Sequence, residues 1–249
     1  MEILIYIYIF IFGTIFTSFF VLLGTRVPMK ETIMGRSHCD NCKSELTLLE
    51  VIPLLGYLVN FGKCKSCKNK ISLVYPLIEV LSGLLYVFFF YKYGQDMLEY
   101  IVIAVLIATM TIITVSDIYY KIVPDIILVV VFPIMFILRI LSPIEFWYDG
   151  IIGGVLGFSI MYLFAWYGKK RYKTEALGGG DIKLYLIIGL FLGYKVLFLS
   201  LFFAAIIALI YAKILKKEGY LPFVPFIYIG TLISYTYGNT IIEWYLNLY

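Results

Sequence analysis

Residues 100–121 read YIVIAVLIATMTIITVSDIYYK, an apolar run that ends at Asp117 and is closed by Lys121. An α-helix of about 20 apolar residues matches the thickness of the hydrocarbon core of a bilayer. Because lipid offers no partner for free backbone N–H and C=O groups, a helix is the conformation that such a segment adopts there. The stretch therefore predicts a membrane-spanning helix that carries a carboxylate at one end.

Similar segments recur along the whole chain. Of its 249 residues, 62% are hydrophobic and only 14% are charged, and the mean hydropathy is +0.96. An ordinary soluble domain carries about 25% charged residues, so this class is excluded. We predict an all-α polytopic membrane protein with about eight transmembrane helices. The expected spans are residues 3–23, 74–91, 100–116, 122–138, 150–168, 182–194, 196–212 and 221–237.

The Lys and Arg residues are distributed unevenly between these spans. If the N-terminus lies outside and the spans alternate, 17 of the 20 fall in inner loops, the others being Lys92, Arg139 and Lys195. Cytoplasmic loops are enriched in Lys and Arg, so we expect both termini outside. Short basic loops beside apolar spans favour membrane lipids as partners and disfavour nucleic acid.

Two pairs of glycines are spaced four residues apart within the expected spans. They are Gly153 with Gly157 and Gly189 with Gly193. In membranes, small residues at this spacing allow helix backbones to approach closely. We therefore predict close helix packing at both pairs and no catalytic role.

One loop is long and polar, and it divides the chain into three expected parts. These are a first transmembrane helix (1–23), a cytoplasmic loop domain (24–73) and a transmembrane bundle (74–249). Residues 1–23 have no basic start and no evident cleavage site, so we expect a spanning helix rather than a signal peptide.

All four cysteines lie in this loop, as two C-x-x-C pairs. They are Cys39, Cys42, Cys64 and Cys67. Two such pairs are typical of a zinc-ribbon-like site with four thiolate ligands, and four protein ligands leave no open position for a substrate. We predict a structural zinc; two disulfides or a redox role are the alternatives, and a reducing cytoplasm disfavours the disulfides. His38 is expected to be a loop residue rather than a ligand.

Four carboxylates lie in or at the ends of the expected spans: Glu79, Asp117, Asp125 and Asp181. Acidic residues in a bilayer are costly and often functional. Asp117 and Asp181 are expected at the same cytoplasmic boundary on different helices, so packing can bring them together. Two aspartates that share a proton can hydrolyse a peptide, one as base on a water and the other as acid on the carbonyl. A solvated helix-end residue is the alternative for each.

The residues around Asp181 suggest how a substrate approaches. Gly178, Gly179 and Gly180 precede it and Lys183 follows. Without Cβ atoms, these glycines leave room for the backbone of an extended peptide. Asp125, beside Pro124, and Glu79 are expected in supporting roles, Glu79 paired with a basic or hydroxyl group of the bundle.

Together these residues resemble the type IV prepilin peptidase family, whose members serve bacterial pilus, secretion and competence systems. The resemblance covers nearly the whole chain and includes the P-x-x-E-x-x-S-G and G-x-G-D-x-K motifs of the family. The matching segments are Ser18–Phe19, Arg26–Pro28, Arg36–Cys39, Pro53–Tyr57, Gly62–Cys64, Tyr75–Gly83, Asp117–Pro124, Gly178–Lys183 and Pro222–Phe226.

The resemblance implies an intramembrane aspartic endopeptidase of the bacterial cytoplasmic membrane. Its substrate would be a prepilin or pseudopilin, whose short basic leader is cut after a glycine at the cytoplasmic face. The new N-terminus would then be methylated with S-adenosylmethionine, an activity that the family places with the cytoplasmic loop. The catalytic role carries over to Asp117 and Asp181. The sequence contains no G-x-G-x-x-G segment, so no such motif indicates where the methyl donor binds.

Other classes of function remain open at this stage. The acidic residues could line an ion or proton path in a transporter, although no pair of broken helices is evident in two matching halves. A membrane scaffold could dock partners through the zinc loop and would tolerate loss of both aspartates. Among enzymes, another G-x-G-D protease, of the signal-peptide-peptidase or presenilin kind, is disfavoured by the cysteine loop and by the segment 76–83.

Overall fold

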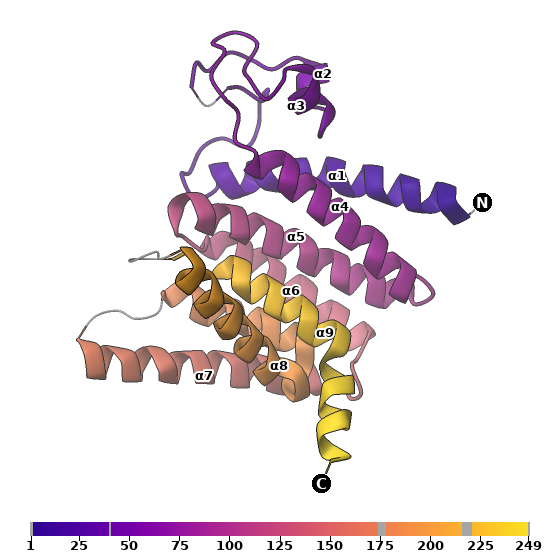
Figure 1. Ribbon diagram of the computed structural model, residues 1–249. Helices are drawn as coiled ribbons and strands as arrows, with labels where there is room; N and C mark the ends of the chain where they lie inside the picture. The colour runs from indigo at the N-terminus through magenta and orange to yellow at the C-terminus, as the bar shows by residue number, and fades with distance from the viewer. Residues whose placement is uncertain (1, 40, 174–177, 216–220, 249) are drawn as a thin grey trace. The chain divides into compact units, whose positions relative to one another are not determined.

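The computed structural model describes residues 2–39, 41–173, 178–215 and 221–248, and within these ranges the regular secondary structure is α-helix, apart from two isolated β-bridges (Figure 1). The chain divides into two compact units, Met1–Val115 and Ser116–Tyr249. The predicted all-α class is therefore confirmed for the described residues.

The first unit contains α1 (Glu2–Arg26), α4 (Val74–Tyr93) and most of α5 (Met97–Tyr120). The long polar loop between α1 and α4 carries two short helices, α2 (Leu48–Val51) and α3 (Leu55–Val59). Helices α1 and α4 pack closely because each presents a glycine to the other: a Cβ on Gly13 would lie 2.8 Å from the ring of Tyr86, and one on Gly83 would lie 2.8 Å from Thr14.

The second unit contains the last turn of α5, then α6 (Asp125–Leu141), α7 (Asp149–Tyr172), α8 (Gly179–Leu215) and α9 (Val224–Leu246). Helix α8 packs against α6, α7 and α9. The contact between α7 and α8 is backbone to backbone, since a Cβ on Gly153 would lie 2.3 Å from the carbonyl oxygen of Gly189, and one on Gly189 would lie 2.1 Å from that of Gly153. The close packing predicted for these glycines is confirmed.

Each of the eight expected spans overlaps a helix, but two of them belong to one element. Segments 182–194 and 196–212 both lie in α8, which is interrupted only where Gly193 leaves helical geometry (φ 72°, ψ 174°). By length and apolarity, five helices of the described chain are candidate membrane spans: α1, α4, α5, α7 and α8. The chain is therefore a multi-pass membrane protein, and the count of eight spans stays a prediction.

The interruption of α8 explains a buried arginine. Arg139, in the last turn of α6, is only 4% exposed. Its guanidinium donates a hydrogen bond of 2.7 Å to the carbonyl oxygen of Phe191, two residues before Gly193. A helix that loses its regular hydrogen bonds within a membrane needs such partners for its carbonyl groups.

Candidate active site

Asp117 lies in the last turn of α5, which ends where Lys121 adopts a left-handed backbone conformation (φ 56°). Its side chain is only 7% exposed. One carboxylate oxygen, Oδ2, accepts a hydrogen bond of 2.9 Å from the backbone N–H of Val224, the first residue of α9. Because a helix N-terminus carries partial positive charge, it favours an anionic group at this position.

Asp181 lies in the first turn of α8, within the same unit. Its backbone N–H donates to the carbonyl oxygen of Gly178 at 3.1 Å, and its side chain is half-buried. The carboxyl groups of Asp181 and Asp117 are close enough to interact electrostatically. The fold thus brings together the two aspartates that the sequence pairs, one from the end of α5 and one from the start of α8.

The three glycines before Asp181 have different surroundings. A Cβ on Gly180 would lie 2.5 Å from the Cβ of Val123, so the start of α8 packs tightly on the segment between α5 and α6. On Gly179 a Cβ would meet no described atom within 4 Å, and on Gly178 it would lie 3.5 Å from Oδ2 of Asp181. Gly179 therefore borders open space among the described residues, whereas a side chain at Gly180 would collide with Val123.

Asp125 and Lys183 form an ion pair that sequence reasoning missed. The Lys183 ammonium lies 2.8 Å from both carboxylate oxygens of Asp125, the first residue of α6. Both side chains are exposed, 52% for Lys183 and 64% for Asp125. Asp125 is thus exposed at a helix end, as expected, but it is paired rather than alone. The residues are 58 positions apart, and no local pattern signals their contact.

Glu79 lies in the second turn of α4, in the first unit, and is 8% exposed. Its carboxylate accepts hydrogen bonds from the hydroxyl group of Ser18 on α1 and from the backbone N–H of Leu54, the latter at 3.0 Å. The hydroxyl partner agrees with expectation. The Leu54 partner was not foreseeable, because it depends on how the loop folds back onto α4.

The four cysteines converge in the loop of the first unit. Their Sγ atoms lie within 4.8 Å of one another, with separations of 3.9 Å for Cys39–Cys67 and 3.9 Å for Cys42–Cys64, and none forms a disulfide. Around a tetrahedral zinc with Zn–S distances of about 2.3 Å, sulfurs are separated by about 3.8 Å. The cluster therefore fits a zinc ion.

The two cysteine pairs fold in the same way. The N–H groups of Lys43 and Lys68 donate to the carbonyl oxygens of Cys39 and Cys64, each at 2.9 Å, and both lysines have positive φ (56° and 59°). These repeated turns direct both sulfurs of a pair to one side.

Local hydrogen bonds also favour the thiolate form of Cys42 and Cys64, two of the four cysteines. A hydrogen bond with the Ser44 hydroxyl group, assisted by the Ser44 backbone N–H, lowers the pKa of Cys42 to about 6. The N–H of Cys67 lowers the pKa of Cys64. His38 takes no part in the cluster, since its Nδ1 lies 3.3 Å from the Arg26 guanidinium. A thiolate is the ligand form that zinc requires.

Comparison with known families and proteins adds a second line of argument. A model of the bacterial peptidase A24 N-terminal domain matches residues 11–93, and a model of the type IV leader peptidase family matches residues 104–213. A prepilin leader peptidase/N-methyltransferase of Bacillus subtilis is 36% identical, covering 96% of this chain and 97% of that protein. Proteins of the same name from Aeromonas hydrophila and Vibrio cholerae are 28% and 29% identical, covering 90% and 92% of this chain and 79% and 97% of those proteins. No solved structure matches.

Proposed function

Because the chain belongs to the type IV leader peptidase family, we propose that it removes the leader from type IV prepilins or pseudopilins and methylates the new N-terminus. The observation that carries the peptidase proposal is the pairing of Asp117 and Asp181. Both lie at the ends of candidate spans, in one unit, close enough for their carboxyl groups to interact.

Asp117 and Asp181 act as an aspartic pair that holds one proton between them. The ionised carboxylate takes a proton from a water molecule, which attacks the carbonyl carbon of the scissile peptide bond. The protonated carboxyl group donates to the carbonyl oxygen, and the carboxyl group that took the proton from water passes it to the amide nitrogen as the bond breaks. Neither residue has a fixed role, because the two titrate as one unit. The Val224 N–H supports this chemistry by orienting the Asp117 carboxylate.

The substrate leader lies extended beside the first turn of α8. Gly179 supports this, since the space where its side chain would be is open among the described residues. The scissile bond follows a glycine, as the family resemblance implies, and the apolar segment after it enters the bilayer. Asp125 and Lys183 are not members of the catalytic pair. Their ion pair links the start of α6 to the first turns of α8, close in sequence to Asp181, and so supports the position of this part of α8.

The loop of the first unit holds one structural zinc through Cys39, Cys42, Cys64 and Cys67. The spacing of the four Sγ atoms, all within 4.8 Å of one another, supports this assignment. Zinc with four thiolates has no open coordination position, so the ion stabilises the loop and takes no part in peptide hydrolysis.

Methyl transfer to the new N-terminus uses S-adenosylmethionine as donor. The curated relatives carry both activities in their name, prepilin leader peptidase/N-methyltransferase, which supports the second activity here. The loop of residues 24–73 is the part of the chain that the family resemblance associates with methylation. The protein works in the bacterial inner membrane, with this loop and the aspartates on the cytoplasmic face and both termini outside, as the distribution of Lys and Arg favours.

The peptidase proposal is tested with the purified full chain in detergent and a synthetic prepilin leader peptide with a basic leader. Products are followed by mass spectrometry, with and without S-adenosylmethionine. Wild type is expected to cut after the leader glycine, and Asp117→Asn and Asp181→Asn are each expected to abolish cleavage. Asp96→Asn, at an exposed loop residue, serves as the matched control and is expected to cleave normally.

Cleavage at wild-type rate by either active-site variant would remove that residue from the catalytic pair. Failure of wild type on a range of such leaders would overturn the peptidase function itself. A product 14 mass units heavier, formed only with the methyl donor, would establish methylation in the same spectrum; its absence with an efficiently cleaved peptide would overturn the second activity alone.

A further inference from the structure

The loop of the first unit contains an apolar stretch that the proposed chemistry does not use. No residue from Val51 to Gly62 is charged, and Glu50 and Lys63 bracket the stretch. An apolar segment of about 10–14 residues is too short to span a bilayer and is typical of a buried helix or of an interfacial or re-entrant one. This stretch is not buried: most of its large apolar side chains are exposed, namely Val51, Ile52, Leu55, Leu58, Val59 and Phe61.

The stretch has a defined shape. Helices α2 and α3 pack against each other, and a Cβ on Gly56 would lie 2.1 Å from the carbonyl oxygen of Glu50, so the two short helices form a tight hairpin (residues 48–61). Between them, Leu54 has φ 62° and ψ −49°, and the N–H of Leu55 donates to the carbonyl oxygen of Pro53 at 2.6 Å. This is a γ-turn of the rare, strained kind, which persists only where other contacts compensate.

The compensating contact comes from a candidate membrane span. The Leu54 N–H donates to the buried carboxylate of Glu79, five residues after the start of α4. At 1.5 Å per residue, Glu79 lies about 7.5 Å along the helix axis from that start. The hydrogen bond therefore holds the turn of the hairpin beside the second turn of α4, a candidate membrane span.

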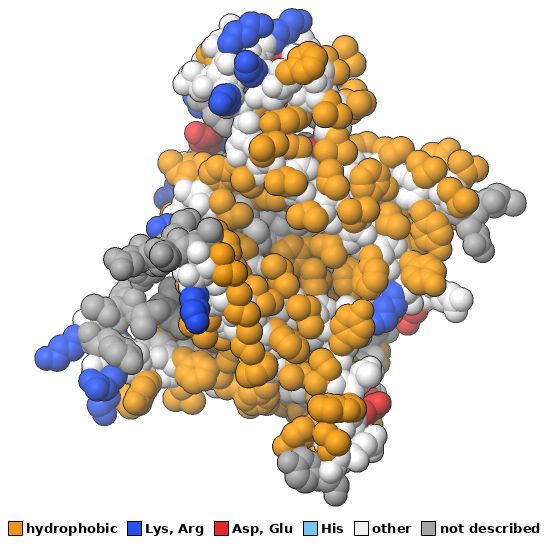
Figure 2. All heavy atoms as spheres, viewed as in Figure 1, with side chains coloured by type: hydrophobic (Ala, Val, Ile, Leu, Met, Phe, Trp, Pro, Cys, Tyr) orange, Lys and Arg blue, Asp and Glu red, His pale blue; other side chains and the backbone are white. Residues whose placement is uncertain are grey.

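Charged residues continue the pattern expected for a membrane surface. Figure 2 shows Lys and Arg side chains gathered at the top of the loop in that view, and hydrophobic side chains along its side below them. Lys63, Lys65, Lys68 and Lys70 follow the hairpin directly and are exposed. Apolar side chains beside a basic cluster are the arrangement of elements that lie in the headgroup region of anionic membranes.

We propose that the hairpin of residues 48–61 is an interfacial membrane element whose exposed apolar side chains enter the acyl boundary of the bilayer that the chain itself spans, and that Glu79 is the residue that holds it there. Lipid is the occupant of this surface because the hairpin is tied to a spanning helix within its own unit. Exposed to water, so many apolar side chains on one short segment would favour aggregation.

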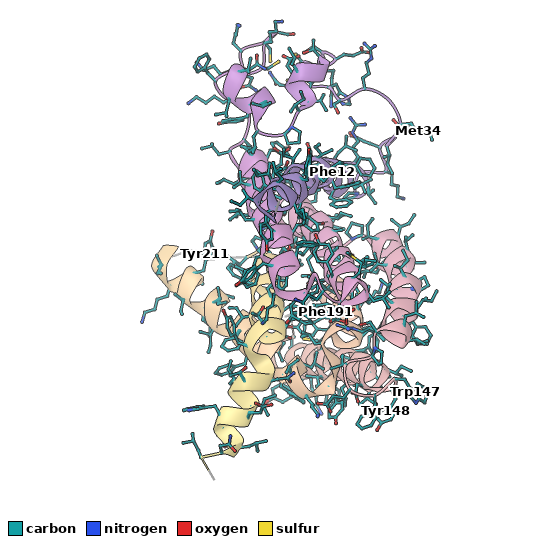
Figure 3. All side chains as sticks on the ribbon, turned by 90° about the vertical axis from the view of Figure 1, so that its right-hand side faces the viewer. Phe12, Met34, Trp147, Tyr148, Phe191 and Tyr211 are labelled. Atoms are coloured by element: carbon teal, nitrogen blue, oxygen red, sulfur yellow. The ribbon has the colours of Figure 1, made fainter. Side chains whose placement is uncertain are left out.

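The test uses the full chain in nanodiscs that contain phosphatidylglycerol and phosphatidylcholine. The photoreactive residue p-benzoylphenylalanine is introduced separately at Leu58, Phe61, Phe12 and Met34, and phospholipid adducts are counted by mass spectrometry after irradiation. Phe12, exposed on the spanning helix α1, is the positive control. Met34 is the negative control, because it is 92% exposed in the same loop but outside the hairpin; Figure 3 labels both control positions.

Positions 58 and 61 are expected to give adduct yields within about threefold of position 12 and at least tenfold above position 34. Yields at 58 and 61 no higher than at 34, or adducts to a second protein chain in place of lipid, would overturn the proposal. The readout does not depend on cleavage or methylation, so it is independent of the proposed function.

The role of Glu79 is tested in the same assay with the photoreactive residue at Phe61. Glu79→Leu removes the acceptor and is expected to lower the lipid adduct yield at least fivefold, whereas Glu79→Gln keeps a carbonyl acceptor and is expected to retain it. Glu79→Ala also removes the acceptor, without adding an apolar side chain of similar bulk, and it should reproduce the effect if Glu79→Leu does not fold. An unchanged yield in a folded Glu79→Leu or Glu79→Ala protein would show that the anchor is not this hydrogen bond.

Discussion

Oδ2 of Asp117 accepts a hydrogen bond of 2.9 Å from the backbone N–H of Val224, a residue 107 positions later in the chain. The contact joins the end of α5 to the start of α9, and both groups are buried. It gives the segment Pro222–Phe226 a physical role, because the N-terminus of α9 fixes the carboxylate on which the proposed chemistry depends. Asp117 therefore has a structural function that can be separated from its catalytic one.

This separation predicts different effects of two substitutions at Asp117. Asp117→Ala leaves the fully buried Val224 N–H without its acceptor and is expected to lower the free energy of unfolding by about 1–3 kcal/mol. Asp117→Asn keeps an acceptor oxygen and should stay close to wild type in stability, although both variants lose cleavage. Thermal unfolding in detergent, followed by intrinsic fluorescence, measures the difference. Equal midpoints for the two variants would contradict the role assigned to the hydrogen bond.

The surroundings of Gly179 and Gly180 predict that alanine substitution at these two neighbouring positions affects cleavage differently. Gly180→Ala places a Cβ 2.5 Å from that of Val123, so the start of α8 must shift and carry Asp181 away from Asp117. Misplacement of a catalytic group by about 1 Å can cost about 100-fold in rate, and we expect a loss of that order in kcat. Gly179→Ala meets no described atom within 4 Å and is the matched control.

Cleavage kinetics with a leader peptide distinguish the two positions. Gly179→Ala is expected to affect KM more than kcat, because the new methyl group occupies the path proposed for the substrate. If Gly180→Ala cleaves as fast as wild type, the contact with Val123 does not position Asp181.

The ion pair of Lys183 and Asp125 joins the start of α6 to the start of α8, and it predicts that charge substitutions at the two positions have coupled effects on cleavage. An exposed pair of this kind contributes only about 0.2–1 kcal/mol to stability, so single neutral substitutions should hardly change the unfolding midpoint. Reversing one charge is different: Asp125→Lys or Lys183→Asp sets like charges face to face beside the start of α8. Each is expected to lower cleavage, and the double exchange is expected to restore a part of it. Additive losses in the double variant would contradict a direct interaction.

The catalytic candidates could be identified from sequence because each carries a local signal. Asp117 ends an apolar run, and Asp181 follows three glycines, so both are predicted at membrane boundaries on different helices. The cysteine cluster was predictable for the same reason, since the C-x-x-C spacing by itself directs two sulfurs toward one ion.

Contacts between distant segments could not be predicted in this way. The partners of Asp125 and Glu79 lie 58 and 25 positions away, and they depend on how helices pack and on a strained turn at Leu54. The break within α8 is different: the expected spans 182–194 and 196–212 meet within three residues of Gly193, where the backbone leaves helical geometry. Neither the packing nor the turn leaves a periodic pattern in the sequence.

The thiolate cluster predicts a pH-dependent zinc content. Because hydrogen bonds lower the pKa of Cys42 to about 6, its thiolate predominates at pH 7–8, and in the metal-free loop it becomes protonated as the pH falls through about 6. Protons then compete with the metal, so purified protein is expected to contain one zinc per chain at pH 7.5 and to bind zinc more weakly as the pH falls below about 6. Elemental analysis after dialysis at each pH measures this directly.

Removal of the metal should loosen the loop without abolishing hydrolysis, because the aspartate pair belongs to the other unit. Cys42→Ser is expected to lose zinc at pH 7.5 and to make residues 39–67 sensitive to protease, whereas Ser66→Ala, at an exposed residue inside the second pair, should retain both zinc and resistance. Cleavage of a leader peptide by Cys42→Ser should remain within about tenfold of wild type. Complete loss of cleavage in a folded, zinc-free protein would contradict a purely structural ion, since the metal would then be required for the chemistry at Asp117 and Asp181.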